Sequence, residues 1–286
     1  MPELITHCLI SDKVSAKIED KDIRALISRF PKEFMLGAQG GDLFFFYHYG
    51  LLKKKESVPE FGERLHVEKV DAFFKAGAEY IKAHPSEPLL SYFLGYLCHY
   101  AADRNVHPFV YKKSNNTTTE HHHIEFMLGK QFLTDTTGES ALDFDMSAPF
   151  DFELSDDISD FYIDLADRLY NQTLTREQIR QTKQDFRDFK VETQHPSAQY
   201  KLISFFAQPV VKFDPMALTY KPENKWEYFT EGEYADFVRD VCTAIDYSDV
   251  LITGAYGFIM KGKPISGFTK HLDGTDFTGK KHEKDE

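Results

Sequence analysis

The sequence predicts an all-α protein that folds as one compact domain of many helices. Two observations support this class. Apolar residues recur at helical spacing along most of the chain, and the alternation typical of strands is sparse. The length of 286 residues is enough to bury a substantial core. Because no internal repeat or linker-like stretch divides the chain, we predict a single helical domain over residues 1–261.

Helical spacing is clear near the N-terminus. Residues 12–29 carry an apolar stripe that predicts one helix, or two helices divided at Asp20. A Gly-rich connection follows at 37–42. The next stripe predicts a helix over residues 66–83, which ends at the His-Pro pair that follows it.

A longer segment, residues 87–106, is apolar on nearly every face and predicts a helix buried in the core. Ser86 precedes it as a typical N-cap, and Pro88 suits the first turn. Another helix is expected over 119–134, and residues 135–150 are loop-like.

The second half continues the helical pattern until about residue 260. The last residues, 262–286, are rich in Gly and Lys and poor in apolar side chains, so we expect a polar, mobile tail. Asp156 and Thr175 are expected to cap two helices. The helices expected before the tail lie near residues 155–172, 175–193, 196–207 and 230–260.

Composition limits the classes of function. The formal net charge of −12 argues against binding to long nucleic acids and against permanent docking on anionic membranes, but it allows transient contact with a membrane surface. No run approaches the roughly 18 apolar residues of a transmembrane segment, and the N-terminus lacks the apolar stretch of a signal peptide. The three cysteines form no Cys-x-x-Cys motif and are expected to be reduced thiols. We therefore expect a cytoplasmic protein.

The histidines concentrate in the first half, where nine of the twelve precede residue 124. The motif His99-x-x-x-Asp103-x-x-x-His107 places three polar side chains on one face of the predicted helix 87–106. A buried Asp between two His is costly without strong partners, and a metal ion would supply them. Alternatively, the three side chains form a purely structural hydrogen-bonded lattice.

A second motif, His121-x-x-x-Glu125, has the same helical spacing and also pairs two zinc-ligand types. The neighbouring His122 and His123 would point elsewhere on that helix. Alone, this motif is also compatible with an exposed polar helix start.

Three single residues extend the pattern. Asp42 closes the loop GAQGGD, where glycines let the backbone approach a site closely. His66 begins a predicted helix, and His7 lies near the N-terminus. Each alone is compatible with a turn or surface residue, but together with the two motifs they indicate a metal centre. The histidines outside this pattern are expected to be structural or solvated.

The order of these motifs resembles the bacterial zinc-dependent phospholipase C family, which is related to the single-strand-specific zinc nucleases. The resemblance covers roughly residues 1–130 and implies a compact all-helical fold of that type, with two or three Zn²⁺ ions in a cleft. It is carried by His7, FMLGAQGGD ending at Asp42, His66, GYLCHYAADRNVHP at 95–108, and His121-x-x-x-Glu125.

The resemblance also implies roles for eight side chains. Asp103 would bridge two of the ions. Asp42 would be the candidate catalytic base for attack of a zinc-activated water on phosphorus. The implied ligand sets are Asp42, His66, His99 and Asp103 for one ion, Asp103 and His7 for a second, and His107, His121 and Glu125 for the third.

Two departures from the family pattern concern the N-terminus and the loop. In secreted members the N-terminal amine of the mature chain shares the zinc at the position of His7, whereas this chain starts Met1-Pro2. The loop reads Gly-Gly-Asp where the family has Gly-Pro-Asp, so Gly41 loosens the turn but leaves the carboxylate in place.

The implied function is hydrolysis of a lipid or small-molecule phosphoester, foremost as a phospholipase C-type phosphodiesterase. The aromatic run 44–47 beside Asp42 either lines an apolar approach for this substrate or belongs to the core. Two alternatives stay open: a phosphoesterase acting on nucleotides or other small phosphate esters, and a non-catalytic metal-binding protein of the same fold. An open coordination position would distinguish an enzyme from a structural zinc protein.

Overall fold

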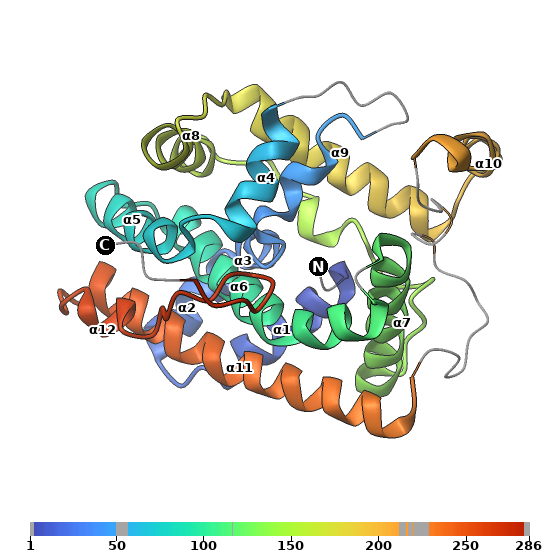
Figure 1. Ribbon diagram of the computed structural model, residues 1–286. Coiled ribbons are helices and arrows are strands. Elements are labelled where there is room, and N and C mark those ends of the chain that lie inside the picture. Colours follow the sequence, from blue (N-terminus) through green and yellow to red (C-terminus); the bar gives the residue numbers. More distant parts are fainter. Residues whose placement is uncertain are drawn as a thin grey trace.

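Helix α6, Glu87–Ser114, runs through the middle of the molecule in the computed structural model (Figure 1). The structure describes residues 3–49, 57–115, 117–211, 216, 219 and 229–282. Helix α6 packs against α3 (Pro31–Gly37) and α11 (Glu231–Met260) on two sides. The predicted burial of this helix is confirmed, since residues 89–103 are all buried.

The all-helical prediction is confirmed for the described residues, whose only β-type pairing is an isolated bridge between Thr275 and Lys281. None of the helices described is both long and apolar enough to cross a bilayer. The other elements are α1 (Leu4–Lys17), α2 (Lys21–Arg29), η1 (Gly40–Phe46), α4 (Ser57–Val67), α5 (Val70–Ala83), α7 (Thr118–Thr137), η2 (Ala148–Phe150), α8 (Asp156–Tyr170), α9 (Arg176–Gln194), α10 (Ala198–Val211) and α12 (Ser266–Thr269).

The predicted caps at Ser86 and Thr175 are confirmed, but the predicted cap at Asp156 is wrong, because Asp156 is the first residue of α8 and Ser155 is its N-cap. The Asp20 side chain accepts hydrogen bonds from the backbone N–H groups of Asp22 and Ile23, so the chain divides there into α1 and α2. Ser86 caps α6 through the N–H of Leu89 at 3.4 Å. Thr175 caps α9 with a reciprocal bond to Gln178. These starts were predictable because a short polar side chain satisfies helix N–H groups within three residues of itself.

The helix predicted over residues 66–83 is wrong. The chain forms α4, which ends at Val67, and a separate α5, which begins at Val70. Lys69 separates them in the left-handed conformation, with φ of 52°. Nothing in a lysine indicates this conformation, and both helices bury an apolar face, so the hydrophobic spacing runs across the break. As a result, His66 lies at the end of α4 and not at the start of a helix.

The polar tail predicted over residues 262–286 is also corrected by the structure. Phe268, Leu272 and Phe277 in this segment are buried. The described part, 262–282, returns from α11 and crosses α6 (Figure 1, red). The average composition concealed these few large apolar side chains among Gly and Lys. Residues 283–286 lie outside the described part, and the domain limits stay a prediction.

Candidate metal centre

Helix α6 supplies the middle of the site. His99, Asp103 and His107 follow one another by single helical turns, as predicted, and all three are buried. The nearest Asp103 oxygen, Oδ2, lies 3.6 Å from His99 Nε2 and 3.9 Å from His107 Nδ1. The i, i+4 spacing therefore brings both rings to the carboxylate between them.

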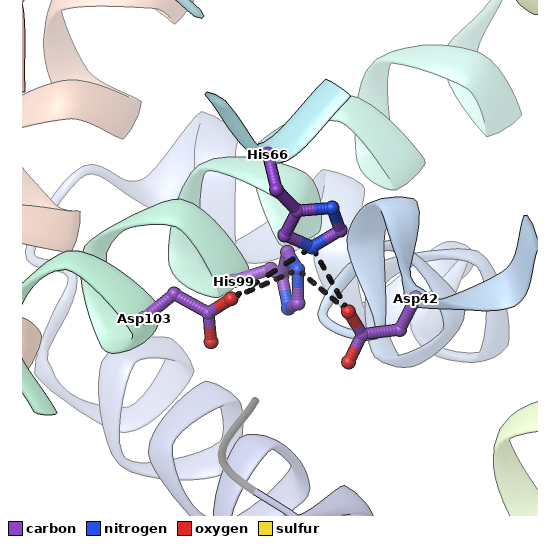
Figure 2. Close-up of side chains that lie close together, drawn as sticks. All are labelled: Asp42, His66, His99 and Asp103. Atoms are coloured by element: carbon purple, nitrogen blue, oxygen red, sulfur yellow. Dashed lines mark hydrogen bonds and ion pairs between the residues drawn. The ribbon is translucent and has the colours of Figure 1, made fainter. Parts of the chain in front are cut away.

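Asp42 and His66 complete a first ligand group with His99 and Asp103 (Figure 2). Asp42 lies in η1, with Oδ1 3.0 Å from His66 Nε2 and 3.5 Å from His99 Nε2. His66 Nδ1 donates a hydrogen bond of 2.7 Å to the carbonyl of Gly62, one turn earlier in α4. That bond sets the tautomer that leaves Nε2 facing the centre of the group.

Gly40 explains why glycines precede Asp42. Its φ is +50°, and a Cβ at this position would lie 1.9 Å from Cδ2 of His99. Glycine alone meets both conditions, because it tolerates positive φ and has no side chain. The loop can therefore pass directly over the His99 ring and deliver the Asp42 carboxylate beside it.

A second ligand group consists of His107, His121 and Glu125, all buried. Helix α7 lies beside α6 and carries two of them. Glu125 Oε1 lies 2.9 Å from His121 Nε2 and 3.5 Å from His107 Nε2. His107 Nδ1 donates to the carbonyl of Phe277 at 2.5 Å, so its Nε2 faces the group.

His7 in α1 lies beside Asp103 and His99 but belongs to neither ligand group among the described residues. Its Nε2 is 3.3 Å from Asp103 Oδ1, and its ring centroid is 4.5 Å from that of His99. Asp103 is thus contacted on one oxygen by His7 and on the other by the α6 histidines. In secreted members of the family that this sequence resembles, the N-terminal amine is a further ligand. Residues 1–2 of this chain lie outside the described part.

The electrostatics favour the ligand forms of His99, Asp103 and Glu125. Burial lowers the pKa of His99 to about 3, despite the neighbouring carboxylates, so the ring is neutral. Burial raises the pKa of Asp103, but the surrounding histidines, His99 foremost, lower it more, and the carboxylate stays ionised. Burial likewise raises the pKa of Glu125, and cationic groups around it, including His121, hold it well below its usual range. Neutral imidazole and ionised carboxylate are the forms that bind zinc.

The arrangement fits metal ions better than a hydrogen-bonded lattice. Among the described side chains, both nitrogens of His7 and His99 and both oxygens of Asp103 are buried without a hydrogen bond. Each such atom costs about 1–3 kcal/mol. In a tetrahedral zinc site with ligand distances near 2.0–2.1 Å, ligand atoms lie about 3.3–3.4 Å apart. The neighbouring ligand atoms of both groups lie 2.9–3.9 Å apart, close to this spacing.

The aromatic run after Asp42 divides between core and site. Phe44 is fully buried against Phe61 and Tyr162, and Phe46 stacks on Phe186. The half-buried Phe45 has its ring centroid 5.0 Å from that of His66. Phe45 therefore flanks the metal centre, whereas Phe44 and Phe46 belong to the core.

Two backbone carbonyls that orient ligands, those of Gly62 and Phe277, were not predicted. The first lies one helical turn before His66, so correct helix boundaries would have indicated it. Phe277 is 170 residues from His107, and no local pattern connects the two.

A family model described as zinc dependent phospholipase C matches residues 6–188. That range contains all eight predicted ligands and ends before the segment that carries Phe277. No curated protein and no solved structure matches the chain.

Proposed function

The chain belongs to the zinc dependent phospholipase C family, and on this premise we propose that it hydrolyses phosphodiesters of the phospholipid type. The observation that carries the proposal is the position of Asp103. It belongs to the first ligand group, where Oδ2 lies 3.6 Å from His99 Nε2, and its other oxygen, Oδ1, lies 3.3 Å from Nε2 of His7. A carboxylate with a histidine at each oxygen could be shared by two neighbouring metal ions, which suits phosphoryl transfer at a multinuclear site.

The two ligand groups would hold one zinc ion each, and Asp103 with His7 would hold a third. Zinc bound there would supply a water with a pKa of roughly 7, and the charge of the ion would neutralise charge on the phosphoryl oxygens. The mixture of imidazole and carboxylate ligands suits zinc. No thiolate is needed: Cys8 and Cys98 are buried, and neither belongs to a ligand group among the described residues.

Asp42 would act as general base. Its Oδ1 is directed at His66 and His99, and its other oxygen points away from both rings (Figure 2). That second oxygen would accept the proton of the attacking water. His66 and His99 would keep the carboxylate in position during this transfer.

Phe45 would contact the apolar part of the substrate. Its half-buried ring lies against His66, one of the more exposed ligands, so a phosphoester at the metal centre would have an aromatic surface beside it. This position favours lipid-like esters over purely polar ones. The cytoplasmic location predicted from the sequence is one reason to include soluble phosphodiesters and nucleotides in a substrate screen.

The test combines zinc content with hydrolysis. Elemental mass spectrometry of wild-type protein should give at least one zinc for each ligand group, and Asp103→Ala should lose more than one ion. Wild-type protein should cleave a short-chain phosphatidylcholine and a chromogenic phosphodiester, and chelation followed by zinc addition should abolish and restore both activities.

Asp164→Ala is the matched control, because Asp164 is a partly buried carboxylate of α8 that pairs with Arg168 and is in neither ligand group. Only trace metal in the wild-type protein would refute the proposal. Full zinc without hydrolysis of any phosphoester would instead identify a non-catalytic metal protein, and cleavage of nucleotides alone would identify the other alternative.

A further inference from the structure

We propose that residues 271–282, here called the C-terminal strap, are a positioning element of the metal centre. The carbonyl of Phe277 would hold the ring of His107 so that Nε2 faces Glu125 and the ion between them. This inference rests on the zinc-binding role proposed above. It assigns a role to a segment that lies beyond the residues matched by the family.

The first observation is the hydrogen bond from His107 Nδ1 to the Phe277 carbonyl, at 2.5 Å in a buried setting. A histidine that binds a metal through one nitrogen usually donates the other N–H to a carbonyl or carboxylate, which fixes its tautomer and its orientation. His107 Nε2 is buried, has no hydrogen bond, and lies 3.5 Å from Glu125 Oε1. The strap therefore completes His107 as an Nε2 ligand.

Phe277 also contacts the first ligand group. Its backbone N–H donates to the carbonyl of His66 at 3.1 Å. Its ring centroid lies 4.8 Å from that of His66 and 5.5 Å from that of His99. One buried residue of the strap thus touches ligands of both groups, and it excludes water from the side of the centre that it covers.

The strap contacts α6 through a row of residues that lies next to the ligands on that helix. Tyr100, Arg104 and Pro108 each follow a ligand of α6 by one residue, so they form a neighbouring stripe on the same helix. Tyr100 donates its hydroxyl to the Thr275 carbonyl at 2.7 Å. Arg104 forms a two-pronged pair with Asp273 at 3.0 and 3.2 Å.

The last residues of the strap form a hydrogen-bonded turn around the Asp276 side chain. The Asp276 side chain accepts hydrogen bonds from the backbone N–H groups of Thr278 and Lys280, and His282 contacts its other oxygen at 2.6 Å. Asp276 is buried, and these partners satisfy it, so the cluster of Asp276 and His282 is structural. Phe277 is held between this closed turn and the contacts with α6.

Gly279 permits a selective test. Its φ is +79°, and a Cβ there would lie 2.4 Å from Cγ of Pro108 and 3.0 Å from the Arg104 carbonyl oxygen. Gly262, earlier in the same C-terminal region, has φ of +64° and open space around its Cβ position. Gly279→Ala and Gly262→Ala therefore share the backbone cost of positive φ, and only the first displaces the strap from α6.

Zinc affinity, measured by competition with a chromophoric chelator, is the main readout. Gly279→Ala should weaken one zinc site by about 10–100-fold, the range for loss of an outer-shell partner, and Gly262→Ala should leave all sites unchanged. In a His107→Ala background, which already lacks that site, Gly279→Ala should cause a much smaller loss, limited to the contacts of Phe277 with His66 and His99. Equal affinities for the two glycine variants, or an equally large loss without His107, would overturn the proposal.

A metal-free measurement separates this proposal from the proposed function. Nitrogen NMR of zinc-free wild-type protein should show His107 protonated on Nδ1, and this signature should be lost in Gly279→Ala but kept in Gly262→Ala. If the wild-type protein as purified holds no zinc but shows this signature, the proposed function is refuted and only the orienting contact remains. A His107 protonated on Nε2 would refute the role of the strap, whatever the zinc content.

Discussion

The two ligand groups are built in different ways. The first joins Asp42, His66, His99 and Asp103, and the groups that set its ring orientations come from residues 40–62: Gly62 accepts the hydrogen bond of His66 from one turn away, and Gly40 makes room for the ring of His99. The second joins neighbouring helices α6 and α7, and the ring of His107 is held by a carbonyl 170 residues distant.

This difference teaches that ligand identity and ligand orientation have separate origins. Residues four apart on a helix share a face whatever the rest of the fold does. The tautomer of a buried imidazole depends on whichever acceptor packs against it, and that acceptor can come from anywhere in the chain. We therefore expect the first group to tolerate changes in the C-terminal segment better than the second. The following variants test this, from the largest expected effect to the smallest.

Asp103→Asn should have the largest effect, because Asp103 belongs to the first group and also faces His7. The amide keeps the volume of the side chain but loses the charge that faces His7, His99 and His107. We expect loss of more than one zinc ion and a drop in hydrolysis beyond the roughly 100-fold upper range for outer-shell changes. Elemental mass spectrometry and the phosphodiester assay measure the two quantities. Loss of one ion only would show that Asp103 serves a single ion.

Lys190→Met should cause the second largest effect, because it breaks a buried ion pair beside His7. Lys190 Nζ lies 3.2 Å from Glu3 Oε1, and Glu3 also caps α1, the helix that carries His7. The variant leaves a buried carboxylate without its cation, which costs about 3–5 kcal/mol. Urea unfolding of the zinc-free protein measures this loss.

The double variant Lys190→Met with Glu3→Gln is the control for the ion pair, since it removes the uncompensated charge. It should recover much of the stability. A double variant as unstable as the single one would mean that the packing of the lysine stem, and not its charge, anchors the start of α1.

Gly40→Ala should weaken the first group selectively. The left-handed backbone costs about 1–2 kcal/mol, and the new Cβ would also push the His99 ring out of place. Gly138→Ala bears the same kind of backbone cost at φ of +78° with no atom near its Cβ. Chelator competition should therefore show a weakened zinc site in Gly40→Ala alone. Equal losses in both variants would assign the effect to backbone strain and not to His99.

Phe45→Ala should have the smallest effect and should leave the zinc content unchanged. Loss of an aromatic contact with an acyl chain costs about 1 kcal/mol, which corresponds to roughly fivefold in KM. The change should appear with short-chain phosphatidylcholine and should be absent with a chromogenic phosphodiester that lacks acyl chains. An equal rise in KM for both substrates would assign Phe45 to the support of His66 and not to substrate binding.

The features that the sequence predicts depend on interactions within a few residues, and the features that it does not predict depend on contacts between distant parts of the chain. The motif of His99, Asp103 and His107 was visible from its spacing, because helical periodicity acts within a few residues, whereas Asp42 and His66 were selected only through the set of motifs and the family resemblance. His66 lies in the first ligand group but at the end of a helix and not at its start, since the left-handed Lys69 has no signature in its residue type. Phe277 was assigned to a mobile tail because the mean composition of a segment does not show which of its single residues are buried.

The sequence by itself determined the helical class, the caps at Ser86 and Thr175, and the spacing of the two helical ligand motifs, because helical periodicity and hydrogen bonding to helix ends are local. Only the tertiary structure decided that η1, α4 and α6 meet at one buried point and that α7 adds a second group beside it. It alone placed the Phe277 carbonyl on His107. These contacts depend on how whole helices and the C-terminal segment pack, and packing joins residues without regard to their separation along the chain.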